Sequence, residues 1–316
     1  MCSGSFHRVA ALALLASGAI AAPVSPQTYT YKVVGDCEIK ADVYRPPDDK
    51  VRPVILWIHG GALIMGHREQ VNSQQLERYL NAGFALVSID YRLAPETKLE
   101  AILEDVRDAH RWLREKGPEL FRIDPDRIAV VGHSAGGYLT LMTGFILKPR
   151  PKALVAFYGY GDVDGDWYSR PDPFYSKQPA VASKEAYESV GGPVLAGTPF
   201  RNNRARFYLY CRQQGLWPKE VTGHDPHTEP KAFDPFCPIR NVTKAYPPTL
   251  LLHGDKDTDV PYEQSLSMAE ELKRRGVEHE LITIPGGGHG FDRALKDPRI
   301  SEVFDRALAF LAAKLK

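Results

Sequence analysis

The sequence predicts an α/β fold, in which helices cover both faces of a mostly parallel central sheet. Two observations in this 316-residue chain predict it. Short apolar, β-rich runs alternate with segments of helical periodicity, which is the pattern of βαβ units. Several of these runs are apolar without interruption, as expected of strands that are buried on both faces.

The expected strands come in an order that starts with an antiparallel pair. They are residues 29–34, 37–44, 54–59, 84–90, 128–132, 153–158, 248–253 and 278–284. Helices are expected between and after them, at residues 99–117, 135–147, 261–276 and 303–311. Gly117 is interpreted as the stop of the first helix, and Pro261 as the first residue of the third.

The rhythm breaks at residues 161–246, which are rich in Pro, Gly, Asp and aromatic residues and have no clear period. This segment is too long for an ordinary loop, so a lid or cap is expected. Residues 22–316 then form one domain with this cap as an insertion. The aromatic side chains expected to form the cap's own core are Trp167, Tyr168, Phe174, Tyr175, Phe207, Tyr208, Tyr210 and Trp217.

The N-terminus has the features of a secretory signal. Residues 1–21 combine a weakly positive start, an apolar run and small residues, with a cleavage site near Ala21 or Ala22. A membrane anchor is the alternative, but the apolar run is shorter than the ~20 residues that a spanning helix needs. We therefore expect an exported protein, extracellular or periplasmic. The net charge of +1 predicts neither a nucleic-acid partner nor an anionic membrane surface.

Three cysteines remain once Cys2 is removed with the signal, so at most one disulfide forms within the chain. Cys211 and Cys237 are the expected pair, and three free thiols are the alternative. Asn241 begins a glycosylation sequon. His224 and His227 are interpreted as part of a solvated turn, since two ligands in a loop are too few for a metal. No metal and no cofactor is predicted.

The strongest chemical motif is Gly132-His133-Ser134-Ala135-Gly136, which matches G-x-S-x-G between a strand and a helix. A serine in such a strained turn exposes its hydroxyl at the carboxyl edge of the sheet. The two glycines have no Cβ to collide with the bent backbone. Ser134 is therefore the predicted nucleophile, and His133 is interpreted as a packing or hydrogen-bonding neighbour, with a second base as the alternative.

A second glycine motif, His59-Gly60-Gly61-Ala62, follows the strand at residues 54–59. Consecutive glycines at this edge let the backbone approach a ligand closely. The N–H groups of Gly60, Gly61 and Ala135 are predicted to bind an oxyanion. A simple tight turn is the alternative reading of the two glycines.

A serine nucleophile needs a base and a carboxylate that orients the base. His289 lies in a glycine-rich loop after the last strand, and an aspartate-rich turn follows the strand at residues 248–253. With Asp257 as the orienting carboxylate, the order Ser134, Asp257, His289 is the Ser-Asp-His order of a known triad.

These motifs resemble the α/β-hydrolase superfamily, and within it the carboxylesterases similar to hormone-sensitive lipase and to bacterial feruloyl and xylan esterases. The resemblance covers residues 30–316 and includes Tyr91-Arg92-Leu93-Ala94-Pro95-Glu96 and Gly254-Asp255-Lys256-Asp257. It places the aspartate three residues after Gly254, which selects Asp257. Asp255 and Asp259 are then interpreted as turn and helix-start residues. Ala62 and His133 depart from the pattern of the hormone-sensitive-lipase group.

The resemblance implies a serine esterase that acts through an acyl-enzyme, without cofactor, on short-chain, aryl or sugar esters. The cap composition lacks an apolar face for a lipid surface, so we expect soluble substrates with acyl chains of roughly two to six carbons. A prolyl-oligopeptidase-like peptidase shares the elbow and the triad order. A non-catalytic binding protein on the same fold is the alternative from another class.

Overall fold

The structure is a computed structural model that describes residues 25–198 and 204–316. The predicted signal peptide and its cleavage site lie outside these residues. The predicted architecture is confirmed in them: eight strands form one sheet in the order β1-β2-β4-β3-β5-β6-β7-β8. The first two strands pair antiparallel and β2 pairs antiparallel with β4, whereas every other neighbouring pair is parallel.

The strands agree with the expected runs to within a few residues. They are β1 Gln27–Val34, β2 Cys37–Tyr44, β3 Arg52–Ile58, β4 Ala85–Ile89, β5 Ile123–His133, β6 Ala153–Phe157, β7 Thr249–Gly254 and β8 His279–Ile284. The side chains of β4, β6 and β7 are buried along their whole length. That burial explains why these strands have continuous apolar runs and no alternation.

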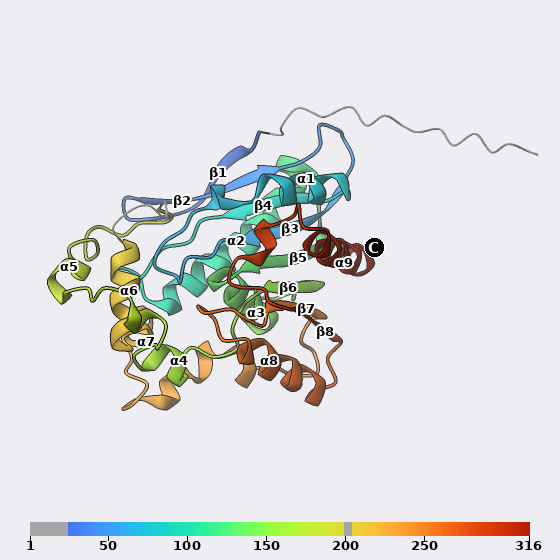
Figure 1. Ribbon diagram of the computed structural model, residues 1–316. Helices are drawn as coiled ribbons and strands as arrows, with labels where there is room; N and C mark the ends of the chain where they lie inside the picture. Colours follow the sequence, from blue (N-terminus) through green and yellow to red (C-terminus); the bar gives the residue numbers. More distant parts are fainter. Residues whose placement is uncertain (1–24, 199–203) are drawn as a thin grey trace, which may run out of the picture.

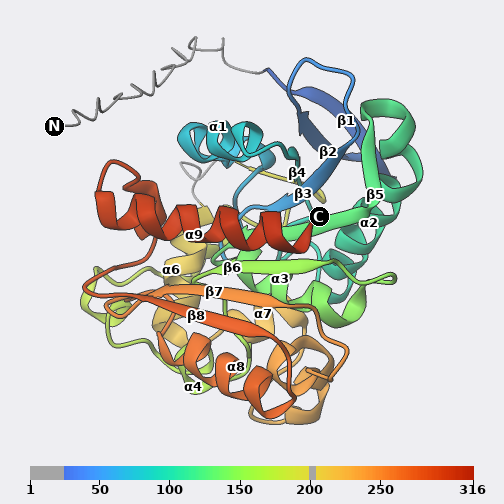
Figure 2. The same cartoon turned by 90° about the vertical axis from the view of Figure 1, so that its right-hand side faces the viewer.

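Helices cover both faces of the sheet. Those that flank the strands are α1 Ser73–Asn81, α2 Leu99–Phe121, α3 Ala135–Ile146, α8 Glu263–Arg274 and α9 Pro298–Lys314, with the short turns η1 Arg68–Gln70 and η5 Phe291–Arg293. Side chains of α1 and α9 pack with one set of alternating strand residues, and those of α2, α3 and α8 pack with the other set. Figure 2 shows α9 lying across the front of the sheet.

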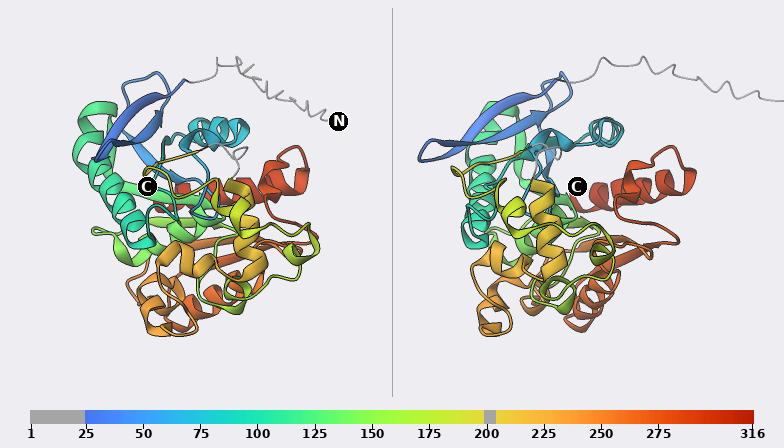
Figure 3. Two further views of the ribbon diagram at one scale, coloured as in Figure 1. Left: turned by 90° about the vertical axis from the view of Figure 1, so that its left-hand side faces the viewer. Right: turned by 60° about the vertical axis from the view of Figure 1, so that its left-hand side comes forward.

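The aperiodic segment folds as a cap of short helices over one end of the sheet. Its elements are α4 Asp166–Ser169, η2 Tyr175–Lys177, α5 Ser183–Tyr187, α6 Arg204–Gln214, α7 Trp217–Thr222, η3 Pro230–Phe236 and η4 Pro238–Arg240. Figures 1 and 3 show these helices gathered at that end. Stacked aromatic rings form part of the cap's interior, with Tyr168 and Trp217 centroids 4.0 Å apart.

Two expectations are corrected by the structure. Helix α2 continues past Gly117 and Pro118 to Phe121, and Arg122 ends it in the left-handed conformation. Gly117 is needed for packing, because a Cβ there would lie 2.8 Å from the Ile123 side chain. The expected Cys211–Cys237 disulfide is not formed: both thiols are buried and free, and burial raises the pKa of each.

A buried ion cluster ties the antiparallel edge of the sheet to α2. Asp105 is fully buried and accepts hydrogen bonds from the Arg92 guanidinium at 2.8 Å on both carboxylate oxygens. The Lys32 ammonium lies 2.7 Å from the same carboxylate. Because Arg92 is itself buried, its charge depends on this partner.

We predict that Asp105→Ala destabilises the protein by about 3–5 kcal/mol, since it leaves the buried Arg92 charge without its carboxylate. Urea unfolding followed by circular dichroism measures the effect. Asp126→Ala is the control: Asp126 pairs with Arg114 at an exposed site, so its loss should change the free energy by less than about 0.5 kcal/mol. Equal losses for the two variants would show that the buried cluster does not stabilise the fold.

Candidate active site

Ser134 lies in a strained turn between β5 and α3. Its backbone angles are φ 56° and ψ −121°, in a region that L-residues rarely adopt. The turn is held by two backbone hydrogen bonds, from Ser134 N–H to Phe157 O and from Tyr138 N–H to Ser134 O, both at 2.9 Å. The strain is consistent with a nucleophile elbow, in which the side chain is presented at the edge of the sheet.

The two glycine motifs touch through their backbones. A Cβ at Gly60 would lie 2.8 Å from His133 O and 3.2 Å from Ser134 Cβ, so Gly60 lies directly against the serine. A Cβ at Gly136 would lie 2.0 Å from Ile58 O, at the end of β3. These contacts place Gly60 beside Ser134, and Gly61 lines the same pocket as both of them.

The loop after Gly60 has an unusual backbone that other parts of the chain support. Gly61, Ala62 and Leu63 all have positive φ, of 112°, 55° and 62°. Ala62, the residue that departs from the family pattern, therefore adopts a conformation that favours glycine. Trp217 of the cap donates a hydrogen bond to Ala62 O at 2.9 Å, and Ala94 N–H donates to Leu63 O at 2.8 Å.

The Tyr91–Glu96 segment contacts the same loop and the end of β3. The Tyr91 ring stacks on His59, with centroids 4.2 Å apart, and its hydroxyl donates to His59 O at 3.0 Å. His59 is fully buried, and burial lowers its pKa to about 3, so the imidazole is neutral. His59 is thus a structural residue of the loop and carries no charge into the site.

Asp257 and His289 form a close pair at the ends of β7 and β8. Their Oδ2 and Nδ1 atoms lie 2.8 Å apart, and the Asp257 side chain is fully buried. The other carboxylate oxygen of Asp257 accepts N–H bonds from Asp259 and Val260, at 2.8 and 3.0 Å. A carboxylate held in this way fixes the orientation of the imidazole, which is what a serine nucleophile requires of its base.

The charges around this pair set the pKa of both groups. Burial would raise the pKa of Asp257, but hydrogen bonds from His253 and His289 hold it well below its usual range. Burial would lower the pKa of His289, but the charges of Asp259 and Asp257 outweigh it and raise that pKa above its ordinary value. Asp257 is therefore ionised at neutral pH, and His289 holds its proton to a higher pH than an exposed histidine does.

Asp259 is a residue whose role the sequence reading missed. It was expected to begin a helix, but α8 begins at Glu263, and Asp259 Oδ2 lies 3.3 Å from His289 Nε2. Its other oxygen accepts hydrogen bonds from the cap residues Tyr175, Tyr208 and Arg212, at 2.8, 2.5 and 2.8 Å. Nε2 of His289 thus lies next to a carboxylate that cap residues hold in place.

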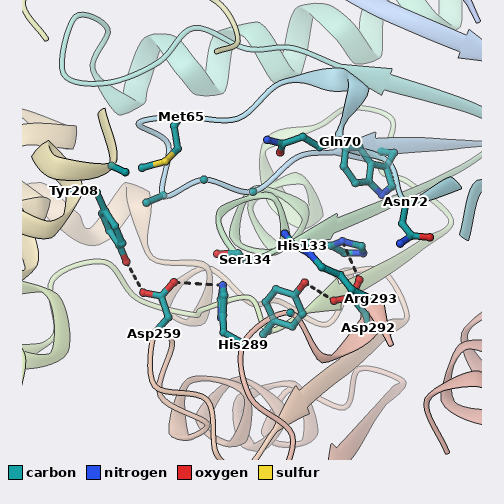
Figure 4. A pocket seen from close by; sticks show the side chains of 17 residues that line it. Met65, Gln70, Asn72, His133, Ser134, Tyr208, Asp259, His289, Asp292 and Arg293 are labelled. Atoms are coloured by element: carbon teal, nitrogen blue, oxygen red, sulfur yellow. Dashed lines mark hydrogen bonds and ion pairs between the residues drawn. The ribbon is translucent and has the colours of Figure 1, made fainter. Parts of the chain in front are cut away.

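Ser134 and His289 both line one pocket of about 530 Å³, together with Gly60, Gly61 and Asp259. Figure 4 shows Tyr208, Asp259 and Met65 on one side of Ser134, and Gln70, Asn72 and His133 on the other. Of the aromatic residues expected in the cap core, Tyr208 is the one that lines this pocket within the described chain. The volume is typical of a site for a small molecule.

His133 lies in a buried network next to Ser134. Its ring packs against Phe157 with centroids 4.5 Å apart, and Nδ1 lies 3.5 Å from Asp292 Oδ2. Burial lowers the pKa of His133. Asp292 already accepts hydrogen bonds from Tyr158 at 2.5 Å and from Gln75 at 2.6 Å. This arrangement favours the packing role predicted for His133 over that of a second base.

Residues 55–293 match the family model of the alpha/beta hydrolase fold. The chain belongs to the α/β-hydrolase fold family. The elbow, the glycine loop and the aspartate–histidine pair of this hydrolase all fall inside the matched residues. Among the described residues, no group of three His, Cys, Asp or Glu side chains could hold a metal, and no helix is long and apolar enough to cross a membrane.

The hydrolase is similar to known proteins along most of its length. It is 30% identical to a non-reducing polyketide synthase of Preussia isomera, over 92% of this chain but 13% of the synthase. An α/β-hydrolase superfamily protein of Enterococcus faecalis aligns at TM-score 0.69 and 22% identity, covering 92% of this chain and all of the other. The thermophilic carboxylesterase EstE1, from a metagenomic library, aligns at TM-score 0.68 and 23% identity, covering 93% and 90%.

We predict that Asp257→Asn lowers kcat by about 10⁴, because the amide no longer stabilises the correct tautomer and the imidazolium of His289. Steady-state ester hydrolysis by the hydrolase measures the loss. Asp255→Asn is the control. Asp255 Oδ1 accepts a hydrogen bond from Gly286 N–H at 2.7 Å and makes no hydrogen bond with the Asp257–His289 pair. A loss of similar size at Asp255 would refute the assignment of the orienting carboxylate.

The Asp259 contact predicts a shift in the pH profile. His289 must be neutral to accept a proton, and its raised pKa delays deprotonation, so kcat/KM should rise at a higher pH than ~6.5, the value for an ordinary histidine. Asp259→Asn removes one of the charges that raise the pKa and should move the acid limb to lower pH. An acid limb that stays in place in this variant would show that Asp259 does not act on the base.

Proposed function

We propose that the protein is a serine hydrolase that cleaves carboxylic esters through an acyl-enzyme on Ser134. The observation that carries the proposal is that His289, whose Nδ1 lies 2.8 Å from Asp257 Oδ2, lines the same pocket as a serine on a strained elbow. His289 accepts the proton of Ser134 as its oxygen attacks the ester carbonyl. It then donates that proton to the leaving alcohol.

The oxyanion formed in the attack needs hydrogen-bond donors that are already in place. In the proposal the N–H groups of Gly60, Gly61 and Ala135 supply them, and the close approach of Gly60 to Ser134 supports this assignment. Water then attacks the acyl-enzyme with His289 as the base, which releases the acid and restores Ser134. Every step uses side chains or backbone of this chain, so the proposal includes no cofactor.

Thioesters are a second candidate class of substrate. The observation in favour is the similarity, along 92% of this chain, to one part of a non-reducing polyketide synthase. An acyl group carried on sulfur presents the same carbonyl to Ser134, and its thiolate leaves more readily than an alkoxide. For the ester reaction we propose acyl chains of roughly two to six carbons, as expected from the sequence. We also propose that the protein is exported, as its N-terminal sequence predicts.

A fluorophosphonate probe tests the nucleophile directly. We predict one label on Ser134 in the wild type, and none in Ser134→Ala, which should keep its thermal unfolding transition while losing hydrolysis of 4-nitrophenyl acetate and of an acetyl thioester. An amino-acyl anilide in the same panel tests the peptidase alternative. A label on another serine, or full activity of Ser134→Ala, would contradict the proposal.

A further inference from the structure

One end of the active-site pocket is built from hydrogen-bond donors, which the ester reaction itself does not use. We call it the donor end, and its residues are Trp57, Gln70, Asn72, His133 and Arg293. In Figure 4 Gln70, Asn72 and His133 lie on the side of Ser134 away from Met65 and Tyr208. The residues come from separate parts of the chain: β3, η1, the start of α1, the end of β5 and η5.

Trp57 is the most deeply buried member of the donor end, with 2% of its surface exposed. Its indole Nε1–H can only donate a hydrogen bond, and no described residue accepts one from it. Buried donors without a partner are rare in proteins because they cost stability, so each one requires an explanation. A wall of the active-site pocket is a place where the partner can be a ligand.

Two amide side chains add further donors at the same end. The Nε2 atom of Gln70 is also buried without a described acceptor. Asn72 caps α1, since its side-chain oxygen accepts N–H bonds from Gln74 and Gln75 at 2.9 and 3.2 Å. The cap fixes which end of the amide is the acceptor, and no described residue accepts from the NH₂ group that remains.

The charges of the donor end nearly offset one another. Arg293 is exposed at the pocket, and its positive charge reaches His133, where it adds to burial in lowering the pKa of that imidazole. Next to it in the chain, Asp292 lies buried against His133 and Tyr158. Because one cation and one carboxylate both line this end of the pocket, it favours neutral oxygen atoms of a ligand over an anion.

We propose that the donor end binds hydroxyl or carbonyl oxygens of the substrate, so that the ester carries an oxygenated group and not a plain hydrocarbon chain. A hydrocarbon in this end would leave the Trp57, Gln70 and Asn72 donors unpaired. Oxygen acceptors would satisfy them, and a site with such donors discriminates against analogues that lack the oxygen. The inference rests on the proposed ester hydrolysis and specifies the class of its substrate.

The test compares esters of the same shape that differ only in oxygen. For the acyl side the pair is 4-nitrophenyl 3,5-dihydroxybenzoate and 3,5-dimethylbenzoate. For the alcohol side it is 3,5-dihydroxybenzyl acetate and 3,5-dimethylbenzyl acetate. In each pair, kcat/KM for the hydroxyl ester is divided by kcat/KM for the methyl ester. This ratio is then compared between variant and wild type, so that the intrinsic reactivity of the esters cancels.

Trp57→Phe removes the indole N–H, and Asn72→Ser removes the NH₂ group while it keeps an oxygen that can cap α1. Each variant should lower the ratio about fivefold in one of the two pairs, the effect of one neutral hydrogen bond. The pair that responds shows whether the oxygenated group is the acyl or the alcohol part. Thermal unfolding shows whether each variant is folded. The two substitutions are independent, so one folded variant is enough for the test.

Trp112→Phe is the matched control. Trp112 lies in α2 against Tyr29 and Phe121, outside the pocket. The hydroxyl-to-methyl ratio of this variant should therefore stay at the wild-type value. Unchanged ratios in both pairs for folded Trp57→Phe and Asn72→Ser, with the esters cleaved, would overturn the donor end as a subsite. A wild type that cleaves none of the four esters would contradict the proposed ester hydrolysis, and the inference with it.

Discussion

The site depends on one close backbone contact, between the turn after β5 and the loop after β3. At Gly136, a Cβ would lie 2.0 Å from Ile58 O, and at Gly60 it would lie 2.8 Å from His133 O. Neighbouring parallel strands bring the two segments to the same edge, and the absence of side chains lets them touch. The contact places Gly60, a candidate oxyanion donor, directly against Ser134.

Residues of the cap and of the Tyr91–Glu96 segment hold the remaining parts of the site in place. Trp217 of the cap and Ala94 of the Tyr91–Glu96 segment hold the loop after Gly60, in which three successive residues have positive φ. On the other side, the cap holds Asp259 against His289 through Arg212. The cap therefore contacts both the loop that carries the candidate oxyanion donors and the carboxylate beside His289.

Much of the fold, the turn at Ser134 and the pairing of Asp257 with His289 could be predicted from the sequence, because short apolar runs and glycine motifs at strand ends are visible there. Asp259 was misread, since its contact with His289 depends on cap residues distant in the sequence. Trp57 lies in a continuous apolar run, and nothing in that pattern shows that its N–H lacks a partner. Asparagine is a common N-cap residue, so the capping role of Asn72 could be predicted from the sequence. Its place in the pocket depends on the tertiary fold and could not. The signal peptide stays a prediction.

The most direct test of the proposed oxyanion site is a crystal structure of the protein after reaction with a short alkyl fluorophosphonate, whose serine adduct mimics the tetrahedral intermediate. We predict phosphorus bonded to Ser134 Oγ after loss of fluoride, with its phosphoryl oxygen within hydrogen-bonding distance of the Gly60, Gly61 and Ala135 N–H groups and with His289 still paired to Asp257. A phosphonyl oxygen directed away from all three N–H groups would contradict it, because the backbone contact would then have no role in the chemistry.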